Sequence, residues 1–207
     1  SIFTLAYGAQ LMGRLAPMLL VAYLTTMLSA DIRYAIRRIK ILSETDELTG
    51  VINMRAFSAI LEREAGLSMR YSRSYSILMV DSDNLKSVND TFGHEAGNRL
   101  LIHVVNHIQT ALRSTDVLAR YGGDEFVVLL PETSGAHARE IAERVRSAVD
   151  RSPLDVRGAQ VPTTVSVGVA SYPDDAQDAD AVLDKADKAM YQSKQNGRNQ
   201  ASAFSAA

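Results

Sequence analysis

Hydrophobic residues recur along this chain with two different periods, and the way these periods alternate predicts its secondary structure. Apolar residues three or four positions apart predict helices, and short continuous or alternating apolar runs predict strands. The helices are expected at residues 53–71, 91–112, 135–149 and 178–194. The strands are expected at residues 75–81, 117–121, 126–130 and 163–170. This order favours an α/β (α+β) domain in which helices flank a mostly antiparallel central sheet.

The first 30 residues differ from the rest because they are almost uniformly apolar. Arg14 is the only charged residue between Ile2 and Ala30, and the sixteen residues 15–30 carry no charge. A bilayer-spanning helix needs roughly 17–25 mostly apolar residues, so this run is at the short end. Basic residues follow it directly, as is typical of the cytoplasmic side of a membrane segment. We expect residues 1–30 to be an apolar helix at the end of a transmembrane segment, the alternative being a soluble packed helix.

Residues 31–45 are expected to continue as a linker or stalk helix. Ile32, Ala35, Ile39 and Leu42 have heptad-like spacing, which favours a parallel two-helix stalk, although a single helix lying on its own domain would show the same short pattern. A polar segment then marks the domain boundary. The main domain is expected at residues 46–200, with residues 153–162 as loop and turn and residues 201–207 as a frayed tail.

Composition excludes several classes of protein. The 22 Lys and Arg residues are balanced by 24 Asp and Glu residues, so no global basic field favours DNA or RNA. The chain has no cysteine, which excludes disulfides and thiolate zinc sites. It also lacks the glycine-rich phosphate loop and the dinucleotide fingerprint. A bound nucleotide would therefore need another kind of site.

Acidic residues at two strand ends are the candidate chemistry. Gly122 and Gly123 form a turn that tolerates positive φ, and Asp124 and Glu125 follow it directly. Asp81 ends another apolar strand. Either group alone would usually be a solvated turn, but together the carboxylates favour a cation site beside bare backbone.

These residues also carry a resemblance. Arg120-Tyr-Gly-Gly-Asp-Glu-Phe126 resembles the signature of the GGDEF family, the diguanylate cyclases, and Asp46-Glu-Leu-Thr-Gly-Val-Ile-Asn53 resembles the family's opening motif. The resemblance implies a palm-like nucleotidyl cyclase fold that condenses two GTP into cyclic di-GMP and releases two pyrophosphates. It further implies two Mg²⁺ ions, or Mn²⁺ in their place, and a homodimer, because one domain supplies one nucleotide site. The location implied is a bacterial inner membrane with the catalytic domain in the cytoplasm, or the cytoplasm alone if the first helix does not span.

The resemblance assigns roles to particular residues. The catalytic and metal-binding group is Asp81, the carbonyl of Ser82, Asp124 and Glu125. The substrate-binding group is Asn84, Leu85, Lys86, Asn89, Asn98, Gly122, Gly123, Lys194 and Arg198. Arg113, Asp116 and Arg144 are expected to form a site where the product, cyclic di-GMP, inhibits the enzyme.

Asn98 departs from the family pattern, which usually has Asp at this position. A carboxylate accepts from the guanine N1–H and N2–H₂, whereas an amide can also pair with adenine. Two alternatives therefore remain beside a GTP-specific cyclase. One is a relaxed or hybrid cyclase that makes cyclic GMP-AMP, and the other is a non-catalytic receptor for nucleotide or cyclic dinucleotide.

Overall fold

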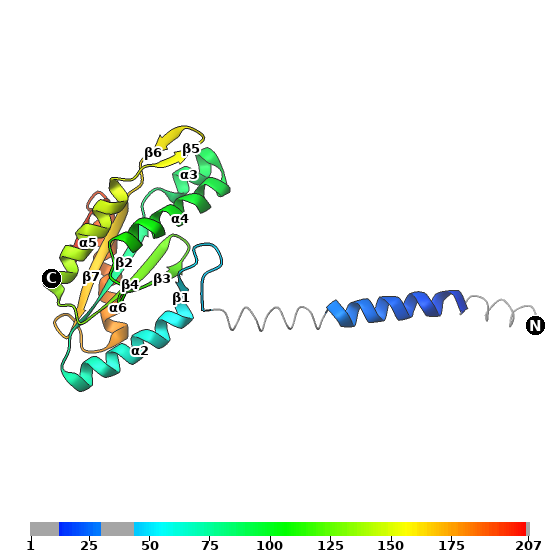
Figure 1. Ribbon diagram of the computed structural model, residues 1–207, viewed down its shortest axis with the longest axis horizontal. Helices are drawn as coiled ribbons and strands as arrows, with labels where there is room; N and C mark the ends of the chain where they lie inside the picture. The colour runs from blue at the N-terminus through cyan, green and yellow to red at the C-terminus, as the bar shows by residue number, and fades with distance from the viewer. Residues whose placement is uncertain (1–12, 30–43, 206–207) are drawn as a thin grey trace, which may run out of the picture. The chain divides into compact units, whose positions relative to one another are not determined.

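The computed structural model describes residues 13–29 and 44–205, and the chain divides into two units between Ser43 and Glu44. In the first unit residues 13–29 are helical (blue in Figure 1), with large apolar side chains exposed along the helix. Within the described ranges, no helix is both long enough and apolar enough to cross a membrane. The expected stalk over residues 31–45 lies almost entirely outside the described residues.

A six-stranded sheet forms the centre of the second unit, in the order β1-β3-β4-β2-β7-β8. Its strands are β1 Ile52–Asn53, β2 Tyr75–Ser82, β3 Val117–Gly122, β4 Glu125–Pro131, β7 Val165–Tyr172 and β8 Ala201–Ala203. The three inner pairings are antiparallel, and only the short edge strands β1 and β8 pair in parallel. The expected mostly antiparallel sheet is confirmed.

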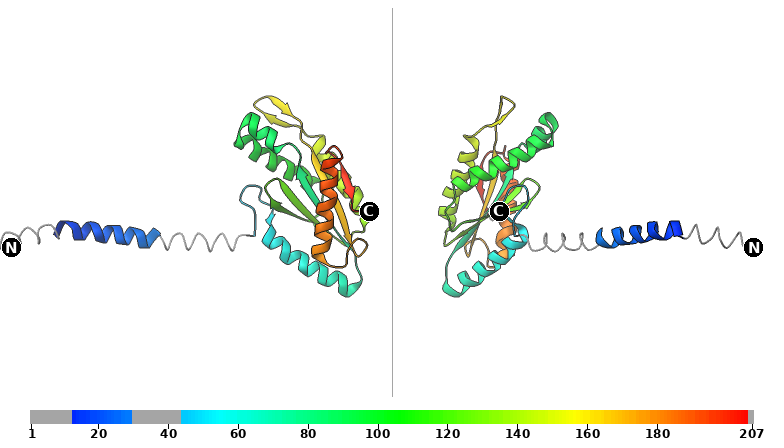
Figure 2. Two further views of the ribbon diagram at one scale, coloured as in Figure 1. Left: turned by 180° about the vertical axis from the view of Figure 1, so that it is seen from behind. Right: turned by 45° about the vertical axis from the view of Figure 1, so that its right-hand side comes forward.

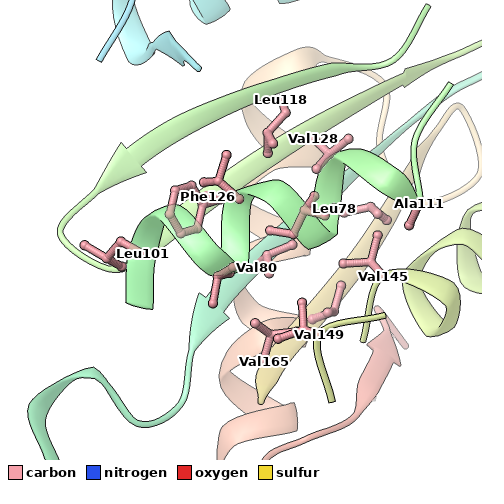
Figure 3. Close-up of a cluster of buried hydrophobic side chains, with 14 of the residues drawn as sticks. Leu78, Val80, Leu101, Ala111, Leu118, Phe126, Val128, Val145, Val149 and Val165 are labelled. Atoms are coloured by element: carbon pink, nitrogen blue, oxygen red, sulfur yellow. The ribbon is translucent and has the colours of Figure 1, made fainter. Parts of the chain in front are cut away.

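Helices cover both faces of this sheet (Figures 1 and 2). They are α2 Met54–Tyr71, α3 Leu85–Phe92, α4 His94–Thr110, α5 Gly135–Asp150 and α6 Ala179–Gln195. Along β2 the side chains alternate between two cores. Leu78 and Val80 pack with α4 and α5, as Figure 3 shows, whereas Ile77 and Met79 pack with α2 and α6. Burial on both faces explains why β2 is a continuous apolar run in the sequence.

Four elements lie where the sequence predicted loop or tail. Most of helix α3 lies in residues 82–90, for which the sequence predicted neither helix nor strand. Val88 is the only buried residue of α3, so the segment shows little apolar periodicity. Strands β5 Leu154–Val156 and β6 Ala159–Val161 form a hairpin whose turn residues, Arg157 and Gly158, both have positive φ. Strand β8 belongs to the expected tail, yet it pairs with β7, so the tail prediction is wrong for these residues.

Gly168 allows α6 to lie directly on β7. A Cβ atom at this position would lie 2.1 Å from both the carbonyl oxygen of Ala186 and the amide nitrogen of Met190. The absence of a side chain thus permits backbone-to-backbone packing. This contact, together with the N-cap in which Asp178 accepts from the Ala181 N–H at 2.8 Å, sets the position of α6 and of the residues at its far end.

Candidate active site

Three of the predicted carboxylates meet where β2 ends and β4 begins. Asp81 and Glu125 are directly opposite each other across the antiparallel pair, so their side chains share one face of the sheet. The N–H of Ser82 donates to the Asp124 carbonyl oxygen at 3.1 Å, which holds the turn against the end of β2. Apolar strands buried on both faces therefore fix these acidic groups in place.

Lys194, in the last turn of α6, completes this cluster. Its Nζ lies 2.7 Å from Oδ2 of Asp81, whose side chain is only 4% exposed. Burial raises the pKa of Asp81 to about 6, with a further contribution from the charge of Asp124, although Lys194 acts in the opposite direction. Burial also raises the pKa of Glu125. Burial would lower the pKa of Lys194, but its hydrogen bond to Asp81 and the nearby acidic charges outweigh this effect and raise it.

The donor set fits Mg²⁺. Carboxylate and carbonyl oxygens are the ligands that this hard cation prefers, and it is usually held by one or two carboxylates together with substrate phosphates and water. In the part of the chain that the structure describes, no three His, Cys, Asp or Glu side chains form a metal site by themselves. A metal bound here would therefore use Asp81, Asp124 and the Ser82 carbonyl together with oxygens of a ligand. In the structure, the ammonium group of Lys194 neutralises part of the negative charge of Asp81.

Bare backbone lies beside the carboxylates on two segments. Cβ atoms built on Gly122 and Gly123 would meet no atom within 4 Å, so the space above this turn is open. Helix α3 begins beside the same strand end, and its N-cap residue, Asn84, makes no side-chain capping bond. The first N–H groups of α3, those of Leu85 and Lys86 included, therefore have no side-chain cap. Uncapped helix N-termini are suited to phosphate.

Residues that the sequence interpretation left without a role hold this arrangement together. Asp83 accepts hydrogen bonds from Thr164 at 2.7 Å, from Ser166 at 2.5 Å and from the N–H of Asn199 at 3.1 Å. The last bond ties the turn after α6, which carries the exposed Arg198, to the end of β2. Asp83 lies in the turn just after β2, two residues beyond Asp81. This spacing could have predicted its place at the site, because alternate residues of an extended chain point to the same side.

Arg120 belongs to the family signature but was assigned no role from the sequence, and it also holds the site together. Its guanidinium donates to the Gly123 carbonyl oxygen at 2.6 and 3.1 Å and pairs with Asp46 at 3.1 Å. Burial raises the pKa of Asp46, but hydrogen bonds from Thr49 and Arg120 outweigh burial, so the net pKa is lowered. The opening motif and the glycine turn, distant in sequence, are thus joined by one arginine.

Comparison with known proteins identifies the family. Residues 43–200 match the family described as "Diguanylate cyclase, GGDEF domain". The chain belongs to this family. Diguanylate cyclase A of Treponema denticola is 46% identical over 124 residues, which are 60% of this chain and 33% of that protein. The response regulator PleD of Caulobacter vibrioides is 37% identical over 160 residues, which are 76% of this chain and 35% of that protein. The chain thus spans about a third of the length of these relatives.

Solved structures agree with this assignment. The GGDEF domain of PA1120 from Pseudomonas aeruginosa is 35% identical with a TM-score of 0.73, and the match covers 77% of this chain and 99% of that one. The coiled coil and GGDEF domain of DgcB from Caulobacter crescentus, in complex with c-di-GMP, is 28% identical with a TM-score of 0.73, covering 86% and 95%. The structure therefore has the GGDEF fold that the sequence predicted.

Asn89 and Asn98, two members of the expected substrate-binding group, lie close together in this GGDEF domain. A Cβ atom on Gly97 would lie 2.0 Å from Oδ1 of Asn89, so the Asn89 side chain packs against Gly97, the residue of α4 that precedes Asn98. Asn98 itself is exposed on the first turns of α4. The pair comes from two helices that pack on each other, α3 and α4. Its position suits contacts to a ligand rather than to the protein core.

The expected inhibitory residues also lie near one another. Asp116 accepts from the Arg113 N–H at 2.8 Å, which closes the turn between α4 and β3, and both residues line a cavity of about 440 Å³. Arg144 reaches the same turn, but its guanidinium donates to the Ala111 carbonyl oxygen at 3.0 and 2.7 Å. In this structure Arg144 therefore caps the end of α4, and Arg113 remains exposed.

Proposed function

We propose that this GGDEF domain is a diguanylate cyclase that joins two GTP molecules into cyclic di-GMP. In each half-reaction a ribose 3′-hydroxyl oxygen attacks an α-phosphorus, the bond from that phosphorus to the β-phosphate oxygen breaks, and pyrophosphate leaves. The observation that carries the proposal is the convergence of Asp81, Asp124, Glu125 and Lys194 beside an open glycine turn. The relatives named as cyclases support it.

The residues of the site have separable tasks in this reaction. Two Mg²⁺ ions, held by Asp81, Asp124 and the Ser82 carbonyl, would stabilise charge on the attacking and leaving oxygens. Glu125, whose pKa burial raises, is a further ligand or accepts the hydroxyl proton. Lys194 and Arg198 contact the phosphates, and Lys194 leaves Asp81 when the metal and nucleotide bind.

One domain holds one nucleotide, so the reaction needs two copies of the chain with their sites facing each other. The proposed active form is therefore a homodimer. Light scattering of the full chain with the α,β-methylene analogue of GTP and Mg²⁺ tests this form. The expected mass is that of two chains. A monomer that still turns over GTP at undiminished specific activity on dilution would contradict the dimer.

Asn98 supports a second candidate, a cyclase that also accepts ATP. Its amide can accept from guanine or pair with adenine, so it discriminates less than a carboxylate does. The experiment gives purified protein Mg²⁺ with GTP, with ATP or with both, and identifies products by mass spectrometry. Cyclic di-GMP alone from the mixture supports the first function, and a large cyclic GMP-AMP peak supports the second. No product from a dimeric sample would favour a receptor.

Product inhibition through Arg113 and Asp116 is part of the proposal. Arg113 is exposed beside a cavity, and a guanidinium can bind phosphate or a guanine edge. Initial rates with added cyclic di-GMP should fall for the wild type and stay high for Arg113→Ala. Arg139→Ala removes another exposed arginine and is the matched control. Equal inhibition of all three proteins would contradict this role.

The apolar helix of residues 13–29 is proposed to associate with a lipid bilayer, which would place the catalytic domain at the cytoplasmic face of a bacterial inner membrane. Large apolar side chains that are more than half exposed lie on all sides of this helix, and Met18, Leu20 and Leu28 are among them. The full chain should float with phospholipid vesicles in a density gradient. Recovery of the chain only in the vesicle-free fractions would contradict the association.

A further inference from the structure

Ser82 carries a hydroxyl that is buried and has no partner. The residue is 3% exposed, and its Oγ makes no hydrogen bond in the structure. Among the buried side-chain polar atoms of residues 13–29 and 44–205, only the Tyr75 hydroxyl shares this condition. Burying a polar group without a partner is unfavourable, so each such group in a folded protein needs an explanation. Tyr75 lies at the other end of β2, roughly 20 Å along the strand from Ser82.

The face of the sheet to which Ser82 belongs is set by its strand register. Asp81 points to the α6 face, where it meets Lys194, so its neighbour in the strand belongs to the opposite face. Val80 and Val165, the latter directly across from Ser82, both lie in the core on that opposite face, as Figure 3 shows. Leu85 and Val88 of α3 pack against the same core.

The hydroxyl therefore lies at the strand end from which the uncapped first turn of α3 begins. The same residue holds the glycine turn through its backbone, since its N–H donates to the Asp124 carbonyl oxygen. Asn89 and Asn98 belong to the helices that cover this face. A nucleotide that places its phosphates on the N–H groups of α3 and its base near these amides would pass over the end of β2.

We propose that the Ser82 hydroxyl donates a hydrogen bond to the bound nucleoside triphosphate. This contact is separate from the metal-binding role expected of the Ser82 carbonyl, and it rests on the proposed function of the site. The hydroxyl has no hydrogen-bond partner among the protein atoms of the structure, and it gains a ligand oxygen as partner in the complex. The Ser82 side chain is then a nucleotide-binding group that the resemblance does not assign.

Ser76 provides a matched control on the same strand and the same face. It is fully buried, but its Oγ donates to the Thr133 carbonyl oxygen at 2.8 Å and lies 2.7 Å from Oγ of Ser171. Ser82→Ala and Ser76→Ala thus remove the same atom from two sites that differ in hydrogen bonding. Since Ser82→Ala removes an unsatisfied group, its melting temperature without ligand should equal that of the wild type or exceed it by about 2–4 °C. Ser76→Ala should melt about 2–4 °C lower than the wild type.

The binding arm uses the full chain with Mg²⁺ and the α,β-methylene analogue of GTP, in which the bond that breaks in the reaction is blocked. Calorimetry should show about tenfold weaker binding for Ser82→Ala and wild-type binding for Ser76→Ala. Inorganic triphosphate with Mg²⁺ locates the acceptor. A similar loss with triphosphate assigns the hydrogen bond to a phosphate oxygen, and a loss seen only with the analogue assigns it to the nucleoside.

Two results would overturn the inference. One is wild-type affinity of Ser82→Ala for the analogue. The other is a fall in its melting temperature as large as that of Ser76→Ala, since this would mean that the hydroxyl already has a partner, such as a water molecule, in the free protein. If the wild type itself does not bind the analogue, the proposed function fails together with this inference, whereas loss of the Ser82 effect alone leaves the proposed function intact.

Discussion

The surroundings of Ser76 and of Ser82, at opposite ends of β2, show how one strand serves two purposes. Around Ser76 the polar groups satisfy one another, because Ser171 and the Thr133 carbonyl meet its hydroxyl and Asp175 accepts from the Ser171 N–H. Around Ser82 the carboxylates of Asp81 and Asp83 have partners, but other polar features do not. The hydroxyl has no partner, the adjacent carboxylate is buried with a raised pKa, and the next helix has no side-chain cap.

This difference distinguishes polar groups that stabilise the fold from polar groups that are available to a ligand. A satisfied network stabilises the fold and offers nothing to a ligand. A cluster of unsatisfied groups lowers stability and is retained where a ligand supplies the missing partners. At the end of β2 that carries Asp81 and Ser82, the Ser82 hydroxyl lacks a partner and burial raises the pKa of Asp81, which is the pattern expected of a ligand site. Substitutions there should therefore affect activity and stability in opposite directions.

Asp81→Asn should have the largest effect. Loss of this carboxylate removes a proposed metal ligand, so the proposed cyclase activity should fall by about 10³-fold or more. The melting temperature at pH 7 should not fall, because the buried charge is removed. Initial rates of pyrophosphate release and a thermal melt measure the two quantities. If Asp81→Asn keeps a tenth of the activity, or melts well below the wild type, then the polar groups at this end of β2 do not favour ligand binding over stability.

Gly168→Ala should be the most destabilising change on β2's partner strand. Gly168 is opposite Met79, midway between the two serines, and a Cβ there would meet the backbone of α6 at 2.1 Å. We expect a loss of about 3 kcal/mol or more in the free energy of unfolding, measured with urea.

Gly66→Ala is the control. It lies inside α2 with nothing within 4 Å, and should raise stability by about 0.5–1 kcal/mol. Similar outcomes for both glycines would refute the close-packing account.

The pH dependence of stability should report the burial of Asp81. Its pKa rises from 3.8 to about 6 in the folded protein. Between these values the folded state holds a proton that the unfolded state has released, so this group makes the protein less stable as pH rises from about 4 to 6. The effect reaches up to about 3 kcal/mol and is constant above pH 6. The stability difference between Asp81→Asn and the wild type should grow over this window. A difference that stays constant from pH 4 to 7 would contradict the assignment.

Asn98→Asp should have the smallest effect on total activity while sharpening specificity. A carboxylate accepts from guanine but not from adenine, so the ratio of kcat/KM for GTP to that for ATP should rise by about tenfold to a hundredfold. Asn106→Asp makes the same change at an exposed position further along α4 and should leave the ratio unaltered. An unchanged ratio in Asn98→Asp would mean that residue 98 does not read the base.

Apolar periodicity predicted the parts of the fold that bury the most surface. The strands at residues 75–81 and 126–130 and the helices after Asn53 and Ser134 were found close to their expected bounds, because both cores depend on them. Short elements with few buried residues gave no such signal. Helix α3 and strand β8 owe their conformation to tertiary contacts with α4 and β7, which local sequence does not encode.

The same distinction applies to the site. The carboxylates could be predicted because their residue types stand at strand ends and carry the family resemblance. The contact of Arg120 with Asp46 could not, since it joins segments 74 residues apart. The exposure of one side chain on the last helix also differs from what the apolar pattern predicts. The apolar pattern of residues 178–194 predicts that Met190 and Tyr191 both point inward, but Met190 is 3% exposed and Tyr191 is 59% exposed.

The central claim is that the Asp81 end of β2 performs the chemistry, and one measurement tests it most directly. The full chain, Asp81→Asn and Ser76→Ala are incubated with Mg²⁺ and GTP, and pyrophosphate and cyclic di-GMP are both quantified. The account predicts two pyrophosphates per cyclic di-GMP for the wild type and for Ser76→Ala, and almost none of either product for Asp81→Asn. Undiminished turnover in Asp81→Asn, or no pyrophosphate from the wild type, would contradict it.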